Sequence, residues 1–324
     1  MIADVITYPQ IGHIRRDSPT LDRLIAPDAR VEMLEDGFIW TEGPVWIEEG
    51  PWLFFSDVPA NRIYRWSERS GVSLYLSPSG FEGHDPLAFR EPGSNGLVRG
   101  PGYSLLMADQ GNRAIASFDL DSRTKTLLAT GYQGRKFNSP NDLVLASSGA
   151  IYFTDPPYGL EGLNESPLKE LPFNGVYRLD PDGGVILLES GLSFPNGIIL
   201  SPDERTLYVA NSDPRRAIIM AYALDASGGI CGRRIFADLT SLVGKDRPGL
   251  PDGMAIDIEG NLFATGPGGI LVFTRDGAML GLIATGAAIA NCTFGDDGRT
   301  LYIASDNMLA RVRTATIGLG FPVP

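Results

Sequence analysis

The sequence predicts an all-β protein, a six-bladed β-propeller, on three observations. A short motif with a polar residue before an apolar run occurs six times along the 324 residues. Each copy is followed by strand-length segments that are rich in β-branched and aromatic residues and bounded by Gly, Asp and Pro. The 39 glycines and 24 prolines are scattered, as in a chain of many short strands and turns. Four antiparallel strands repeated six times form a propeller.

The first segment of each unit carries the motif. Its copies are TEGPVW (41–46), SNGLVRG (94–100), PNDLVLA (140–146), PNGIILS (195–201), PDGMAID (251–257) and ANCTFGD (290–296). The polar residue in these copies is Glu42, Asn95, Asn141, Asn196, Asp252 and Asn291. The spacing between copies varies, which is expected if loop lengths differ around a constant core.

A second and a third strand-length segment follow each motif, for example IYFTD and GVYRLDPDG after the third copy. A fourth segment is found for only five of the six units. The segment VEMLEDGFIW (31–40) leads into the first motif in the same style. We therefore expect this N-terminal strand to complete the C-terminal blade, closing the ring and pairing two open sheet edges. The alternative, a pair of stacked β-sheets, gives no reason for six matching motifs.

The repeat spans 31–314, which we expect to be one propeller. Residues 1–30 are expected to form an N-terminal arm and residues 315–324 a C-terminal tail, both packed on the ring.

Composition restricts the partners and the compartment. The chain has 27 basic and 39 acidic residues, a net charge of −12, which argues against nucleic acid as a partner. The N-terminus lacks a continuous apolar signal region, and no later run approaches membrane-spanning length, so no membrane partner is expected. Two cysteines, Cys231 and Cys292, are too few for a disulfide framework. A cytoplasmic location is expected.

The repeated polar residues predict a metal site. The first strand of each propeller blade lines the central channel, so the six motif residues should converge at one mouth of it. Two carboxylates, Glu42 and Asp252, with amide oxygens from the asparagines, are the ligands that a hard divalent cation prefers. His13, His84 and the two cysteines have no metal-ligand spacing, which disfavours softer metals. The alternative is that Asn or Asp before Gly only forms turns.

Other catalytic classes fit less well. No GxSxG nucleophile motif occurs, and a Ser–His–Asp triad would have to use His13 or His84. His84 follows the first blade in FEGHDP, where a solvated loop histidine is the simpler interpretation. Tyr158 follows the rigid DPP turn and is expected at the rim of the site, where it would contact substrate.

Taken together, these motifs resemble the senescence marker protein/gluconolactonase family, which includes regucalcin-like lactonases. The matching stretches, TEGPVW, FNSPNDLVLASSGAIYFTDPPYG, FPNGIILSPDERTLYVANS and LPDGMAIDIEGNLFAT, lie between about 41 and 274. The resemblance implies a six-bladed propeller with one catalytic divalent cation held by Glu42, Asn141, Asn196 and Asp252. Ca²⁺ is the first expectation, with Mg²⁺, Mn²⁺ and Zn²⁺ as alternatives.

The resemblance also implies a small lactone as substrate, with Asn95 and Asp109 binding it or shaping its pocket. One departure concerns substrate choice. Several members of the family carry Arg two residues before the first metal-binding Asn, and this chain has Ser139 there.

The function predicted is metal-dependent hydrolysis of a lactone. The cation would polarise the carbonyl group, Asp252 would assist the attacking water as a base, and Glu42 would hold charge and geometry. Two alternatives stay open at the same site. One is hydrolysis of phosphotriesters, and the other is a non-catalytic propeller in which a calcium ion only braces the channel.

Overall fold

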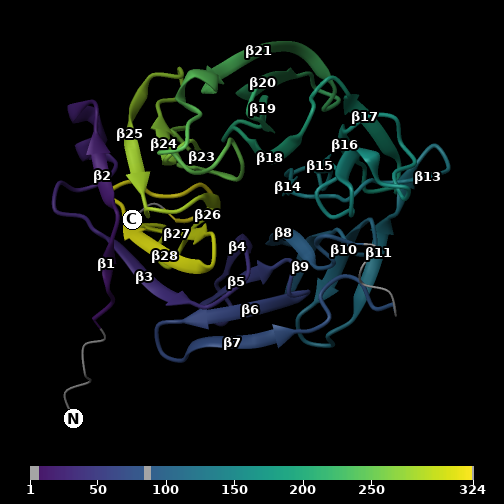
Figure 1. Cartoon of the computed structure of the whole chain (residues 1–324), viewed down its shortest axis with the longest axis horizontal. Helices are drawn as coiled ribbons and strands as arrows, with labels where there is room; N and C mark the ends of the chain where they lie inside the picture. The colour runs from purple at the N-terminus through teal and green to yellow at the C-terminus, as the bar shows by residue number, and fades with distance from the viewer. Residues whose placement is uncertain (1–6, 84–88, 323–324) are drawn as a thin grey trace.

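The computed structural model describes residues 7–83 and 89–322. In this part of the chain six antiparallel sheets stand around a central axis as the blades of a propeller (Figure 1). The predicted fold class is thereby confirmed, and a pair of stacked sheets is excluded. The described helices are short 3₁₀ turns, none long and apolar enough to cross a membrane: Pro19–Arg23, Leu163–Glu165 and Thr240–Leu242.

The strands of each blade run outward from the axis in chain order. Blade 1 holds β4 (Thr41–Ile47), β5 (Trp52–Asp57), β6 (Arg62–Ser67) and β7 (Gly71–Leu76). Blade 2 holds β8 (Ser94–Arg99), β9 (Ser104–Asp109), β10 (Ala114–Asp119) and β11 (Lys125–Ala129). Blade 3 holds β14 (Leu143–Leu145), β15 (Ile151–Asp155), β16 (Gly175–Leu179) and β17 (Val185–Glu189). In the sequence, the hairpin of β12 (Gly131–Tyr132) and β13 (Arg135–Lys136) lies between blades 2 and 3.

The second half of the ring repeats the pattern. Blade 4 holds β18 (Pro195–Leu200), β19 (Thr206–Asp213), β20 (Arg216–Leu224) and β21 (Ile230–Asp238). Blade 5 holds β22 (Met254–Ile256), β23 (Leu262–Gly266), β24 (Gly269–Phe273) and β25 (Met279–Ala284). Blade 6 holds β26 (Ile289–Gly295), β27 (Thr300–Ser305) and β28 (Met308–Arg313) from the end of the chain.

An N-terminal strand closes the ring. Strand β3 (Val31–Asp36) pairs antiparallel with β28, so that Val31 lies opposite Val312 and Asp36 opposite Met308. Figure 1 shows this junction as purple β3 beside yellow β28. The prediction that an N-terminal strand completes the C-terminal blade is confirmed. The two ends of the repeat are therefore held together by backbone hydrogen bonds.

The residues before β3 also join the sheets. Strand β1 (Gln10–Ile11) pairs with β3, and β2 (His13–Arg16) pairs with β25, so blades 5 and 6 each gain a fifth strand. Between them and β3, Leu21 and Ile25 pack into the core shared by these blades. This segment therefore covers two sheet edges that would otherwise be open to unwanted pairing.

The hydrophobic core lies between the blades rather than within one sheet. Each cluster of buried apolar side chains in the described residues joins two neighbouring blades. Phe54 of blade 1 packs with Met107 of blade 2, for example, and Trp46 of blade 1 stacks on Tyr302 of blade 6 with ring centroids 5.6 Å apart. The blades are thus fixed relative to one another, and the inner strands that carry the motif are held in register.

Candidate functional site

The inner strands turn their motif residues toward the axis through irregular backbone. In four blades the pairing of the inner strand shifts register at the motif, as in β-bulges: Glu42/Val45, Ser94/Leu97, Pro195/Ile198 and Ile289/Asn291. In blades 3 and 5 the regular strand begins only after the motif residue, Asn141 or Asp252. Bulges re-aim a side chain away from the normal alternation of a strand. The irregular backbone explains why these polar side chains point toward the axis and do not follow the alternation of the strand.

The glycine after the motif residue has a steric role. A Cβ atom on Gly43 would lie 2.2 Å from the carbonyl oxygen of Asn95, and one on Gly197 would lie 2.1 Å from that of Asp252. Neighbouring inner strands therefore approach backbone to backbone, which only glycine permits. The E-G and N-G pairs at these two positions therefore allow the inner strands to meet closely at the axis.

Hydrogen bonds link the motif residues from blade to blade. Gly96 N donates to Asn141 O at 2.8 Å, and Thr154 Oγ1 donates to Asn196 O at 2.7 Å. Across the ring closure, Asn291 Nδ2 donates to Glu42 Oε2 at 3.3 Å. Residues 249 positions apart in sequence become neighbours in this way. Five of the six motif residues therefore converge on one cavity at the axis, as expected. The sixth, Asn291, donates to Glu42 but lines a second cavity instead, so the prediction that all six meet at one mouth was wrong for Asn291.

One cavity of about 560 Å³ opens at this ring. Six of the seven predicted site residues line it: Glu42, Asn95, Asn141, Tyr158, Asn196 and Asp252. Their position in one cavity is established by the structure, whereas their roles as metal ligands or substrate contacts stay predictions.

Two carboxyl groups line the cavity, one from the buried Glu42 and one from the partly exposed Asp252. Glu42 is 3% exposed, and burial, followed by repulsion from Asp142, raises the pKa of Glu42 to about 8. Burial, followed by repulsion from Glu42, raises the pKa of Asp252 well above its ordinary range. Two neighbouring acids that repel each other are stabilised as anions by a cation placed between them.

The asparagines supply neutral oxygen atoms. Asn196 Nδ2 donates to Ser212 Oγ at 3.0 Å, which fixes the amide, and its Oδ1 is buried with no hydrogen-bond partner. Asn95 Oδ1 is likewise buried and without a partner. A buried acceptor left unpaired costs free energy, so these oxygens are ready to receive a ligand.

The donor set fits a hard divalent cation. Two carboxylates with amide oxygens match the oxygen ligands that Ca²⁺ and Mg²⁺ prefer. Among the described residues no group of three or more His, Cys, Asp or Glu side chains lies close enough to hold a metal. A cation in this cavity would therefore depend on asparagine oxygens as well as on Glu42 and Asp252.

Asp109 does not line the cavity, so the structure does not support the predicted contact with substrate. Its carboxylate is fully buried, pairs with Lys125 Nζ at 3.0 Å and accepts from Asn112 Nδ2 at 2.7 Å. These contacts give it a structural role at the end of β9. The resemblance to the family suggested Asp109, but the sequence around it contains no information on where the side chain points.

Ser139 and the histidines also lie apart from the cavity. Ser139 is fully buried, and its hydroxyl donates to Pro156 O at 2.7 Å and accepts from Gly159 N at 2.9 Å. His13 is exposed on β2, the outermost strand of blade 5. His84 lies outside the described residues. His13 lies four strands away from the inner strand β22 of its blade, so it cannot form a catalytic triad with residues at the axis.

Several lining residues were not predicted. Arg90 and Glu91 reach the cavity from the connection between β7 and β8, and Trp40, Leu250 and Ile289 form part of an apolar wall. The connection is long for a β-protein, since β7 ends at Leu76 and β8 begins at Ser94. Long connections are often functional. The length of this connection was therefore the feature of the sequence that could have pointed to Arg90 and Glu91.

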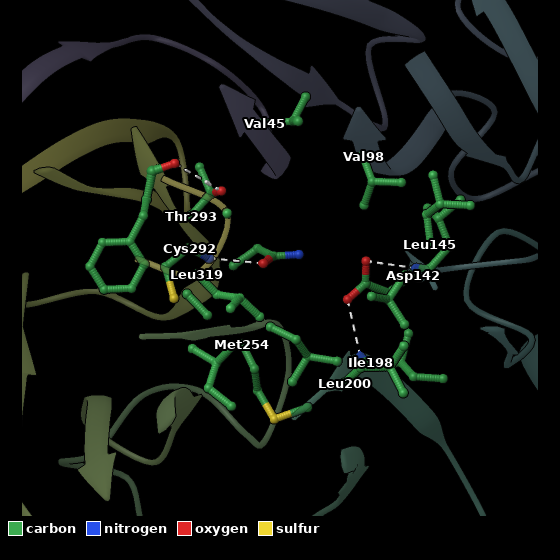
Figure 2. Close-up of a pocket in the computed structure, with 18 of the residues that line it drawn as sticks. Val45, Val98, Asp142, Leu145, Ile198, Leu200, Met254, Cys292, Thr293 and Leu319 are labelled. Atoms are coloured by element: carbon green, nitrogen blue, oxygen red, sulfur yellow. Dashed lines mark hydrogen bonds between the residues drawn. The ribbon is translucent and has the colours of Figure 1, made fainter. Parts of the chain in front are cut away.

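A second cavity of about 390 Å³ lies further along the same inner strands (Figure 2). Apolar side chains such as Val45, Val98 and Leu200 line it, and Leu319 of the C-terminal tail contributes to it. The Asp142 carboxylate points into it and accepts from the backbone N–H groups of Leu143 and Ile198. Because this carboxylate is already paired with the backbone and lies among apolar groups, the first cavity remains the candidate active site.

Comparison with known proteins agrees with this geometry. The family model for the SMP-30/Gluconolactonase/LRE-like region matches residues 40–307. A gluconolactonase of Zymomonas mobilis is 47% identical over 95% of this chain and 88% of its own length. A pentonolactonase of Haloferax volcanii is 26% identical over 82% of this chain and 80% of its own length.

A solved structure described as a gluconolactonase from Xanthomonas campestris shows the same architecture. It superposes with a TM-score of 0.80 at 33% identity, covering 96% of this chain and 99% of the other. This chain therefore belongs to the SMP-30/gluconolactonase/LRE-like family.

Proposed function

We propose that this protein is a metal-dependent lactonase that opens the ring of a small lactone in the cavity at the propeller axis. The observation that carries the proposal is the convergence of Glu42, Asn141, Asn196 and Asp252 in one cavity, in a chain 47% identical to a gluconolactonase. The cavity volume of about 560 Å³ suits a small molecule.

In this proposal Glu42, Asn141, Asn196 and Asp252 hold the cation, with Ca²⁺ as the first choice and Mg²⁺, Mn²⁺ or Zn²⁺ as alternatives. When bound, it supplies Lewis acidity toward the carbonyl oxygen and toward the attacking water. Asp252 accepts the proton of the water, and Glu42, fixed by Asn291 Nδ2, keeps the ring of ligands in place. Tyr158, stacked on Phe194 with centroids 5.6 Å apart, forms a rigid side of the substrate pocket. We retain the cytoplasm as the proposed compartment.

The test is a pH-stat assay of metal-stripped protein against aliphatic and sugar lactones, with each cation restored in turn. We expect turnover only with a cation present, together with a rise in Tm on addition of that cation. Cleavage of a fluorophosphate with no cleavage of any lactone would favour the phosphotriesterase alternative. A cation-dependent rise in Tm without hydrolysis of either class would favour a non-catalytic calcium propeller.

The variant Asp252→Asn distinguishes a catalytic role of Asp252 from a role in stability. We expect turnover to fall by roughly 10²–10⁴-fold, the usual contribution of a general base. The Tm of the metal-free protein should not fall, because the substitution removes one of two acids that repel each other, at nearly constant shape. Full lactone turnover by Asp252→Asn would refute the assigned role.

A further inference from the structure

Glu91 is a buried acid in the candidate active site that the ligand set does not use. Its side chain is only 12% exposed and lines the same cavity as Asp252 and Tyr158. Among the described residues its charged partner is Arg90, whose Nη2 lies 3.4 Å from Glu91 Oε1 and whose side chain is 51% exposed. A solvated arginine at that distance compensates little of the cost of burying a carboxylate.

The backbone holds Glu91 in this position from two sides. The N–H groups of Arg90 and Glu91 both donate to Gly159 O, at 3.0 and 3.3 Å, directly after Tyr158. Two residues further on, Gly93 N donates to Val58 O at 3.0 Å. The segment is thus tied to the loops of blades 1 and 3, which border the cavity. A carboxyl group that is costly to bury is thus held in a fixed place, and its ion pair with the half-exposed Arg90 compensates little of that cost, which indicates a functional role.

From this placement we propose that Glu91 is the general acid of the reaction, donating a proton to the ring oxygen of the lactone as the ring opens. This inference rests on the proposed lactonase function and adds a residue and a step to it. Water, losing a proton to Asp252, attacks the carbonyl carbon, the bond from that carbon to the ring oxygen breaks, and the ring oxygen takes the proton of the Glu91 carboxyl group. The product is a hydroxy acid. Asp252 then releases its proton to solvent and Glu91 regains one, so both groups return to their starting states.

The opening of an aliphatic lactone is accelerated by such a group. An alkoxide is a poor leaving group, so protonation as the bond breaks lowers the barrier. Burial raises the pKa of Glu91 to about 7, while Arg90 lowers it, so the acid form is available near neutral pH. Glu42, Asp252 and Tyr158 are the other titratable groups around it in the described residues, and Glu91 repels the anions of all three.

The dependence on the leaving group tests the proposal. The substrates are δ-valerolactone, which releases an alkoxide, and dihydrocoumarin, which releases a far more acidic phenol. For Glu91→Gln we expect kcat on δ-valerolactone to fall by about 10²-fold or more, and kcat on dihydrocoumarin by less than about tenfold. KM should change little for either substrate. Glu161→Gln, at an exposed acid on the loop after Tyr158, is the matched control and should resemble the wild type.

Each result has one interpretation. Equal losses on both substrates, or no loss on either, would overturn the role of Glu91 while leaving the lactonase function standing. If the wild type opens neither lactone with any cation, the proposed function itself fails. Glu91→Asp keeps a carboxyl group. Its kcat on δ-valerolactone should be at least about tenfold higher than that of Glu91→Gln. Absence of that recovery in a variant with wild-type Tm would also contradict the assignment.

Discussion

Replacing Gly197 with alanine tests the steric basis of the ring of inner strands. Gly197 follows the motif residue Asn196 in β18, and a Cβ atom there would lie 2.1 Å from Asp252 O and 2.6 Å from Asp252 C. Both atoms belong to the backbone of the next blade, so no rotation of a side chain can relieve the overlap. The two inner strands would have to separate.

The size of the effect follows from this overlap. Ordinary contact between a Cβ atom and another heavy atom begins at 3.4 Å. The added Cβ would lie 2.1 Å from Asp252 O, so the two backbones have to separate by more than 1 Å. Overpacking of this kind costs about 1–3 kcal/mol. At about 1.5 °C per kcal/mol for a chain of this length, Tm should fall by roughly 2–5 °C. Because Asp252 is a proposed ligand, the affinity for Ca²⁺ should fall by about tenfold or more.

Differential scanning calorimetry and calcium titration measure the two effects. Gly232→Ala is the matched control in the same blade, because a Cβ there meets only Ala223 Cβ at 3.5 Å. That variant should keep the Tm and the calcium affinity of the wild type. If Gly197→Ala did the same, close backbone approach at the axis could not be the reason for the glycine that follows four of the six motif residues.

Two further predictions concern residues outside the cavity. Leu21→Ala removes a fully buried side chain of the N-terminal segment and should lower stability by about 2–5 kcal/mol, whereas Leu127→Ala, at a residue 45% exposed, should cost less than about 1 kcal/mol. Equal Tm values for the two variants would show that the N-terminal segment is not part of the core. Lys125→Met leaves the buried Asp109 carboxylate unpaired and should lower stability by about 3–5 kcal/mol. KM for the lactone should stay unchanged, and a selective rise in KM would instead restore Asp109 as a substrate contact.

The sequence by itself determined the repeat and therefore the fold. Six copies of one motif, each followed by strand-length apolar segments, can bury their faces only by packing sheet against sheet around an axis. The missing fourth strand of the last unit and the extra one at 31–40 predicted the closure between β28 and β3. The convergence of Glu42, Asn141, Asn196 and Asp252 followed from equivalent positions in different blades, since symmetry around an axis brings them together.

Only the tertiary structure decided what the individual side chains around that ring do. Asp109 and Ser139 stand near motif residues in sequence, but the direction of a side chain depends on local register and on its partners, and both are directed to buried hydrogen bonds. Glu91 belongs to no motif. It reaches the cavity because Gly159 O, 68 positions further along the chain, accepts its backbone N–H group. Contacts of that range depend on how the blades pack, and no local pattern of residues encodes them.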